Sequence, residues 1–269
     1  MIKIAIHSVP RSGSTWLGNI FNSHPEVQFR YQPLFSYAFK SYLTTSSEKK
    51  DIDEFFEKIL ASTDGFINQK EAIADGTVPS FGKAGIPKAT CYKEVRYHHI
   101  LENLVNQSPD LKLILLIRNP MAVIYSWKNA PKEFKTHLGW DFEKEWFQAP
   151  SKNENREEEY NGFAKWKEAA LLYMKLAHQN TQRVKLITYD YLLKNTVKAA
   201  KELFDFSGLD YVLQTDEFIN QSKQRNNMDA YSVFKTKKND EMWQNLPEEI
   251  IAYIEQDLKG TALEQFLKG

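Results

Sequence analysis

The stretch that decides the fold is MIKIAIHSVPRSGSTWLGNIFNSH, residues 1–24. It begins with an apolar, β-branched run at residues 2–6, which is typical of a buried parallel strand. A short loop follows at residues 8–14, and apolar residues then recur at helical spacing over residues 16–21. A helix that starts after such a loop presents unpaired N–H groups and the positive end of its dipole, and Arg11 adds a full charge. The loop is therefore predicted to bind a phosphate or a sulfate.

The residues of this loop indicate which kind of anion donor it serves. A loop that binds a nucleoside triphosphate ends in Gly-Lys-Ser/Thr, whose hydroxyl binds magnesium. Here that Gly-Lys pair is missing, and Arg11 stands ahead of Gly13. The sequence RSGSTWL at residues 11–17 resembles instead the 5′-phosphosulfate loop of the sulfotransferase family; the alternative is a Gly/Ser turn before an ordinary helix. The resemblance implies that the phosphosulfate is bound by Arg11, Ser12, Gly13, Ser14, Thr15 and Trp16.

A second motif, RNPMAVIYSW, begins at Arg118 and follows the most continuous apolar run of the chain, residues 111–117. The run predicts a central parallel strand. Asn119 is a favourable N-cap, and Pro120 suits the first turn of a helix. Ser126 comes seven residues after Asn119, two helical turns along the same face, so Arg118 and Ser126 can face one ligand. The motif resembles the 3′-phosphate site of the sulfotransferase family.

The two motifs together describe one donor, 3′-phosphoadenosine 5′-phosphosulfate (PAPS). Plain ATP has no 3′-phosphate and would leave Arg118 without a partner. The resemblance further implies that Tyr189 packs on the adenine and that Lys235 and Lys237 lie in a basic loop over the 3′-phosphate. A core tyrosine and a solvated charge run are the respective alternatives.

The catalytic groups are expected at the end of TCYKEVRY, residues 90–97, which predicts a strand. Three charges in a strand are costly to bury, so an exposed edge strand is the alternative to a functional one. The sulfotransferase family carries a catalytic lysine on this strand, and Lys93 matches it. Glu94 is the first candidate for the general base, and His99 is the second.

The sequence QPL at Gln32 stands where many carbohydrate sulfotransferases carry Glu-Pro-Leu, with the glutamate as the base. An amide cannot accept a proton at neutral pH. Gln32 is therefore expected to bind the substrate by hydrogen bonding, and the base must lie elsewhere or the acceptor must differ.

Composition sets wider limits. The 269 residues carry 35 Lys+Arg and 35 Asp+Glu, so the net charge of zero does not favour a nucleic-acid or membrane-surface partner. The single cysteine, Cys91, excludes an internal disulfide and a cysteine-based metal site. No stretch approaches the ~18 consecutive apolar residues of a transmembrane helix, and no leader peptide precedes the first strand, so a cytoplasmic location is expected.

The predicted architecture is one α/β domain over residues 1–269: three layers, with a central, mostly parallel sheet flanked by helices, in the P-loop NTPase-like sulfotransferase fold. An inserted cap is expected at residues 129–160, where aromatic side chains either stack on sugars or pack onto the domain. Residues 72–77 predict a further short strand.

The predicted function is transfer of the sulfuryl group of PAPS to a hydroxyl or amine of an acceptor, with a carbohydrate or glycan favoured. A base removes the acceptor proton, the acceptor attacks sulfur in line, and Arg11, Lys93 and loop N–H groups stabilise the developing charge. No metal is expected. The alternatives are a P-loop kinase or NTPase, which requires magnesium, and a non-catalytic nucleotide-binding protein of the same fold.

Overall fold

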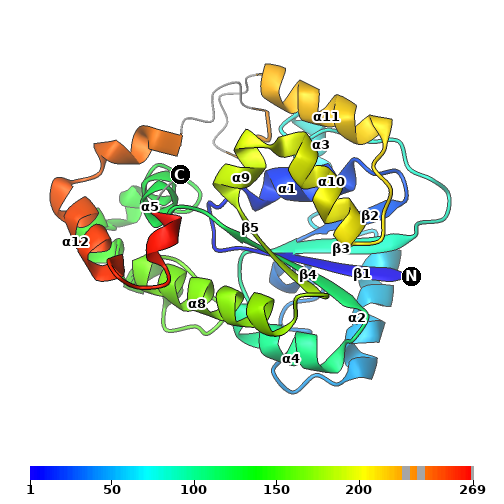
Figure 1. Ribbon diagram of the computed structural model, residues 1–269, viewed down its shortest axis with the longest axis horizontal. Helices are drawn as coiled ribbons and strands as arrows, with labels where there is room; N and C mark the ends of the chain where they lie inside the picture. The colour runs from blue at the N-terminus through cyan, green and yellow to red at the C-terminus, as the bar shows by residue number, and fades with distance from the viewer. Residues whose placement is uncertain (226–230, 235–239, 268–269) are drawn as a thin grey trace.

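The computed structural model describes residues 1–225, 231–234 and 240–267, and its centre is a five-stranded sheet (Figure 1). The strand order is β2-β3-β1-β4-β5, and every pair of neighbouring strands is parallel. The strands are β1 (Ile2–His7), β2 (Val27–Tyr31), β3 (Ala89–Glu94), β4 (Leu111–Ile117) and β5 (Val184–Thr188). The predicted parallel sheet is confirmed.

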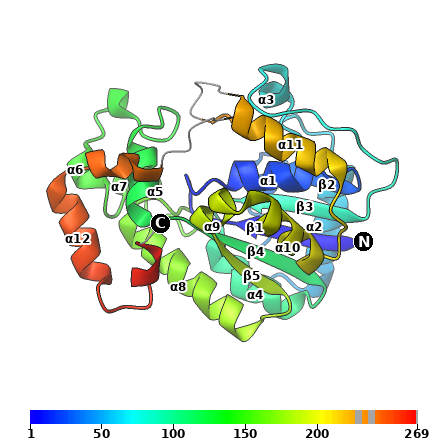
Figure 2. The same cartoon turned by 45° about the horizontal axis from the view of Figure 1, so that its top comes forward.

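Helices cover both faces of this sheet, as Figures 1 and 2 show. One face packs against α1 (Ser14–Asn22), α9 (Tyr189–Lys194), α10 (Thr196–Phe206) and α11 (Leu213–Gln224). The other face packs against α2 (Lys49–Ala61), α4 (Leu101–Gln107) and α8 (Phe163–Gln179). Two separate hydrophobic clusters fill the two interfaces, because the central strands are apolar on both sides. The predicted three-layer α/β fold is confirmed.

The remaining helices are short or lie beyond the sheet. They are α3 (Lys70–Ala74), α5 (Pro120–Lys128), α6 (Phe142–Glu145), α7 (Pro150–Asn153) and α12 (Glu248–Leu258), with the 3-10 helices η1 (Pro33–Phe35), η2 (His98–Ile100), η3 (Thr136–Leu138), η4 (Asp240–Asn245) and η5 (Glu264–Phe266). Within the described part of the chain, no helix has the length and apolar character needed to cross a membrane.

One local prediction was wrong, and one of the alternatives does not hold. Residues 72–77 do not form a strand: they comprise the end of α3 and the turn after it, where the Ile73 N–H donates to the Gln69 carbonyl and the Asp75 N–H to the Glu71 carbonyl. A short apolar run is compatible with either a strand or a helix. The strand β3 is not at an edge, because it lies between β2 and β1 and all six of its residues are buried.

The cap segment at residues 129–160 packs onto the domain. Phe134 is buried against Trp127 of α5, with ring centroids 5.1 Å apart, and Phe142 packs against Phe134 at 5.9 Å. Trp146 and Phe147 pack against the cluster that α8 shares with α12. These aromatic side chains therefore stabilise the position of the segment, which was one of the two alternatives for them.

Candidate active site

The predicted anion loop lies at the carboxyl end of β1 and leads directly into α1. Arg11 and Gly13 both have positive φ, 68° and 88°. A Cβ atom at Gly13 would lie 2.4 Å from Cε2 of Tyr189, so only glycine fits there. No side chain caps the start of α1, and the buried Ser12 Oγ has no hydrogen-bond partner among the described residues. The N–H donors at the start of α1, together with the Ser12 hydroxyl, are therefore suited to bind a tetrahedral anion.

The second motif also lies at a strand-to-helix junction, between β4 and α5. The Asn119 side chain accepts hydrogen bonds from the backbone N–H groups of Met121 (2.8 Å) and Ala122 (3.3 Å), as an N-cap does. The Arg118 carbonyl accepts a hydrogen bond of 3.0 Å from Trp166 Nε1 on α8. The junction is therefore fixed both by its own cap and by the opposite helix layer.

Two hydrogen bonds join the two motifs. Arg118 Nη1 donates to the Arg11 carbonyl oxygen at 2.7 Å, and Arg11 Nε donates to Ser126 Oγ at 3.1 Å. The sequence separates these residues by more than a hundred positions. The carboxyl ends of the neighbouring strands β1 and β4 bring them together, and one ligand can therefore contact both motifs.

Tyr189 lies between the two motifs. It is buried, its ring lies 4.7 Å from the Arg118 guanidinium, and it also packs against Gly13 and the Trp16 ring. Trp16 Nε1 in turn donates to Ser222 Oγ at 3.0 Å, which ties α1 to α11. The structure thus brings together most of the predicted donor residues, namely Arg11, Ser12, Gly13, Ser14, Thr15, Trp16, Arg118, Ser126 and Tyr189. Lys235 and Lys237 lie outside the described residues.

Lys93 and Glu94 end β3 beside the anion loop, in register with the end of β1. Lys93 is 2% exposed and its Nζ lies 4.5 Å from the centre of the Tyr31 ring, while Glu94 is fully buried. Burial lowers the pKa of Lys93 and raises the pKa of Glu94, and the opposite charge of each residue acts against the shift of the other. Glu94 Oε1 accepts a hydrogen bond of 2.7 Å from the Leu34 N–H, so this carboxyl supports η1.

Gln32 is held in place by Arg96, which is itself paired with Glu159. The sequence did not indicate this ion pair. Gln32 Oε1 accepts a hydrogen bond of 3.1 Å from Arg96 Nη1, and Arg96 Nε donates to Glu159 Oε1 at 2.9 Å. Arg96 also lies 4.0 Å from the centre of the Phe35 ring. The Gln32 N–H donates to the Lys93 carbonyl at 2.9 Å, which places the amide beside the end of β3. No spacing rule links Arg96 with Glu159, because the partners lie on different segments.

His99, the second candidate base, lies away from this cluster. Its ring is half-buried near Tyr97, at 6.0 Å between centroids. Burial lowers the pKa of His99, and the charges of Glu157 and Glu158 act in the other direction. No hydrogen bond or ring contact among the described residues joins His99 to Arg11, Lys93 or Gln32.

A carboxylate of the cap segment completes the cluster, and sequence reasoning missed it. Glu133 forms an ion pair with Lys152 at 3.4 Å, and both side chains are largely buried. Burial lowers the pKa of Arg11 and of Lys93, and the charge of Glu133 acts against both shifts. Glu133 stands in an irregular segment without a motif, so no pattern in the sequence pointed to it.

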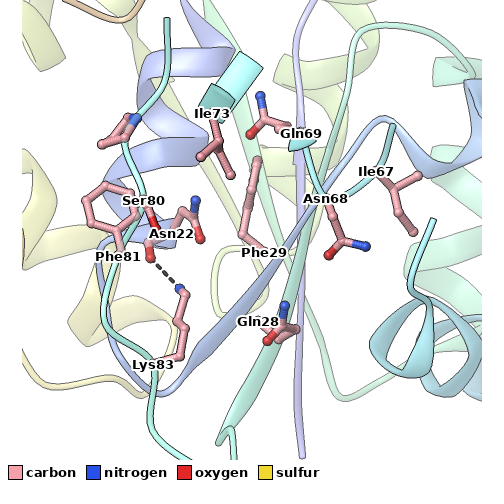
Figure 3. Close-up of a pocket in the computed structure, with 11 residues that line it drawn as sticks. Asn22, Gln28, Phe29, Ile67, Asn68, Gln69, Ile73, Ser80, Phe81 and Lys83 are labelled. Atoms are coloured by element: carbon pink, nitrogen blue, oxygen red, sulfur yellow. Dashed lines mark hydrogen bonds between the residues drawn. The ribbon is translucent and has the colours of Figure 1, made fainter. Parts of the chain in front are cut away.

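No metal centre competes with this site in the described part of the chain, and a cavity near β2 lies apart from it. No group of three or more His, Cys, Asp or Glu side chains there could hold a metal ion. This cavity has a volume of about 140 Å³ and lies between the end of α1 and β2; Figure 3 shows the residues that line it. Beside it, Lys83 Nζ donates to the carbonyls of Asn22, His24 and Val27. None of the predicted site residues lines this cavity.

Comparison with known proteins identifies the family. The family model of the sulfotransferase domain matches residues 2–266, and the chain therefore belongs to the sulfotransferase domain family. The predicted class of enzyme, a PAPS-dependent sulfotransferase, is confirmed. A search of curated proteins found no match to the chain.

Solved structures show the same fold. Mouse sulfotransferase SULT7A1 complexed with PAP (3′-phosphoadenosine 5′-phosphate) is 13% identical, with a TM-score of 0.55 over 99% of this chain and 87% of the mouse chain. Retinol dehydratase in a complex with retinol and PAP is 15% identical, with a TM-score of 0.55 over 97% of this chain and 82% of that chain. At these identities the likeness concerns the fold.

Proposed function

We propose that the chain transfers the sulfuryl group of PAPS to a hydroxyl group of a carbohydrate. The observation that carries the donor half of this proposal is the pair of hydrogen bonds between the motifs, Arg118 to the Arg11 carbonyl and Arg11 to Ser126. An anion loop and a second arginine site that touch one another suit a nucleotide with phosphates at both its 5′ and 3′ positions.

The donor residues then divide into three roles. The loop from Arg11 to Trp16 binds the 5′-phosphosulfate, Arg118 and Ser126 bind the 3′-phosphate, and Tyr189 packs on the adenine. The bound PAP of the similar SULT7A1 and retinol dehydratase structures supports such a nucleotide for this fold. The predicted part of Lys235 and Lys237 in closing over the 3′-phosphate stays a prediction, as do the cytoplasmic location and the single domain with a cap.

The chemistry needs an in-line displacement at sulfur. The acceptor oxygen attacks sulfur, the bond between sulfur and the bridging oxygen breaks, and its electron pair leaves with the phosphate as PAP. Negative charge develops on the bridging oxygen and on the sulfuryl oxygens. Arg11, Lys93 and the N–H groups at the start of α1 lie at one end of the sheet and are suited to stabilise it.

The surroundings of Gln32 support a carbohydrate acceptor. Phe35 and Phe66 are each 43% exposed and lie 5.9 Å apart, and Phe66 also packs on Tyr31 at 5.5 Å. The polar groups of Gln32 and Arg96 adjoin these rings. A sugar presents C–H faces that pack on aromatic rings and hydroxyls that hydrogen-bond to polar groups, so this combination suits it.

An acceptor screen tests the proposal. The chain is incubated with ³⁵S-labelled PAPS and panels of mono- and oligosaccharides, phenols, long-chain alcohols and tyrosine peptides. We expect label in the carbohydrate panel, and we expect Phe35→Ala to raise the KM for that acceptor more than it lowers kcat. Transfer to phenols, alcohols or peptides alone would contradict the carbohydrate assignment and leave the donor assignment intact.

A further inference from the structure

The transfer requires a group that removes the proton of the acceptor hydroxyl, and two carboxyl groups near the site are almost completely buried. Glu94 is fully buried, accepts a hydrogen bond from the Leu34 N–H, and has a pKa raised by burial. Glu159 Oε1 accepts from Arg96 and its Oε2 accepts from Asn161 Nδ2 at 3.1 Å. Both carboxyls therefore hold the structure around the site together.

The cap segment that carries Glu133 is fixed beside the anion loop. The Lys132 N–H donates a hydrogen bond of 2.7 Å to the Tyr231 hydroxyl, and the Tyr231 ring lies 5.0 Å from the Arg11 guanidinium. The N–H groups of Glu133 and Phe134 both donate to the Ala130 carbonyl at 2.8 Å, which forms a tight turn. Buried Phe134 anchors this turn, so the position of Glu133 is defined by packing on both sides.

The environment of Glu133 keeps its carboxylate ionised. Burial raises the pKa of Glu133, but the positive charges of Lys152, Arg96 and Arg11 together hold it below its usual value. Its side chain remains 23% exposed, whereas that of Glu159 is 5% exposed. Glu133 is thus an ionised, only partly exposed carboxylate that is paired with Lys152 at 3.4 Å and whose charge acts on Arg11 and Lys93.

We propose that Glu133 is the general base of the sulfuryl transfer. This inference rests on the proposed function, because it assigns the proton acceptor of that reaction. The Glu133 carboxylate takes the proton of the acceptor hydroxyl while the acceptor oxygen forms its bond to sulfur and PAP departs. The products are a sulfate ester, PAP and protonated Glu133, which returns its proton to water. A carboxylate from the cap thereby takes the role that the amide of Gln32 cannot fill.

Donor binding strengthens this base. The phosphosulfate of PAPS brings negative charge next to Arg11, which partly cancels the positive field that stabilises the ionised form of Glu133. The affinity of Glu133 for a proton therefore rises when the donor is present, and this is the state in which the proton must be taken up.

The test uses the full chain and an acceptor that takes up label in the screen described above. We would measure transfer of ³⁵S from labelled PAPS to that acceptor for the wild type, Glu133→Gln, Glu133→Asp and Glu94→Gln, together with calorimetric binding of PAP. We expect Glu133→Gln to lower kcat by ~10²- to 10⁴-fold, Glu133→Asp to restore part of this loss, and Glu94→Gln to lower kcat less than ~10-fold. PAP binding should be no weaker in Glu133→Gln than in the wild type.

The pH profile gives a second measurement that a merely structural role would not affect. The wild-type rate should fall as acidic pH protonates Glu133, and this acidic limb should disappear in Glu133→Gln. The titratable and charged groups around Glu133 are Arg11, Tyr31, Lys93, Glu94, Arg96, Lys132, Lys152, Glu159 and Tyr231. They are the same in both proteins, so the difference between the two profiles reports on Glu133.

The outcomes separate this inference from the function on which it rests. A Glu133→Gln protein that turns over within ~3-fold of the wild type, or a larger loss in Glu94→Gln, would overturn the assignment of Glu133. A wild-type chain that binds PAP no better than ADP, or that transfers label from PAPS to no member of the acceptor panels, would instead contradict the proposed function.

Discussion

The proposed donor half and the proposed acceptor half of the site are built in different ways. The donor half consists of two contiguous motifs, each at a strand-to-helix junction, whose backbone and arginines hydrogen-bond to one another. The acceptor half is assembled from side chains of separate segments: Gln32, Lys93, Arg96, Glu133, Lys152 and Glu159. The donor half therefore depends mainly on local backbone geometry. The acceptor half depends on buried charged side chains whose charges are balanced by nearby partners.

Removing a buried charge from the acceptor half should have the largest effect on the free energy of unfolding. Arg96→Ala leaves the Glu159 carboxylate, whose side chain is 5% exposed, without its ion-pair partner. We expect the free energy of unfolding to fall by ~3–5 kcal/mol, measured by urea denaturation. The control is Lys175→Ala, which removes an exposed pair with Glu102 and should cost less than ~1 kcal/mol. Equal losses in the two variants would contradict the role of buried charge.

One methyl group added at Gly13 should be enough to weaken PAP binding by the donor half. In Gly13→Ala the new Cβ collides with the Tyr189 ring, so either the loop or the tyrosine must move. We expect calorimetric affinity for PAP to fall ~100-fold or more, equivalent to ~2.7 kcal/mol. Gly139→Ala is a matched control, because Gly139 also has positive φ but a Cβ added there would meet nothing within 4 Å. Comparable affinities of the two variants for PAP would show that the close packing of Gly13 against the Tyr189 ring is unimportant for binding.

His7 is the last residue of β1 and directly precedes the anion loop. It is fully buried against Tyr92 and His98, and burial, followed by the charge of Lys93, lowers the pKa of His7 to about 3. The folded chain therefore binds fewer protons than the unfolded chain between pH ~6.5 and ~3, and stability falls as pH falls through that window, by up to ~1.4 kcal/mol per pH unit. Urea titrations of His7→Gln should show a shallower acidic slope, while exposed His178→Gln should follow the wild type. Parallel slopes for wild type and His7→Gln would contradict this account.

The smallest effect is expected at the helix cap of the second motif. Asn119→Ala removes the side-chain acceptor of the Met121 and Ala122 N–H groups at the start of α5. We expect a loss of ~1 kcal/mol in the free energy of unfolding and only a few-fold weaker PAP binding. Asn119→Asp keeps the capping acceptor but loses the hydrogen bond from Asn119 Nδ2 to the Leu267 carbonyl, so it should recover only part of the loss. A loss of PAP binding as large as that in Gly13→Ala would mean that Asn119 itself contacts the donor.

The same contrast explains how much could be predicted from the sequence. The loop at Arg11 and the junction at Arg118 were recognisable because their residues are contiguous and their geometry follows from a strand, a turn and a helix. The parallel sheet was predictable from its apolar runs for the same reason. Residues 72–77 were misassigned because a run that short fits a helix as well as a strand.

The acceptor half could not be predicted because its partners meet only in three dimensions. Nothing in the spacing of Arg96 and Glu159 indicates that they pair, and Glu133 lies in a segment whose path is set by the packing of Phe134 and neighbouring aromatic residues. The charges at residues 93–96 suggested an edge strand as an alternative, yet β3 is interior, and Lys93, Glu94 and the following Arg96 all find partners. These charges are paired only in the folded chain, so their pairing could not be predicted from the sequence.

The central claim is that the two motifs form one site for a nucleotide with a 3′-phosphate. Its most direct test is calorimetric binding of PAP and of ADP, without magnesium and then with it, for the wild type and Arg118→Ala. We predict that PAP binds ~10- to 100-fold more tightly than ADP without magnesium, as expected for a charge-assisted contact to the extra phosphate, and that Arg118→Ala abolishes this preference. Equal binding of PAP and ADP, or nucleotide binding only as the magnesium complex of ATP, would contradict the claim.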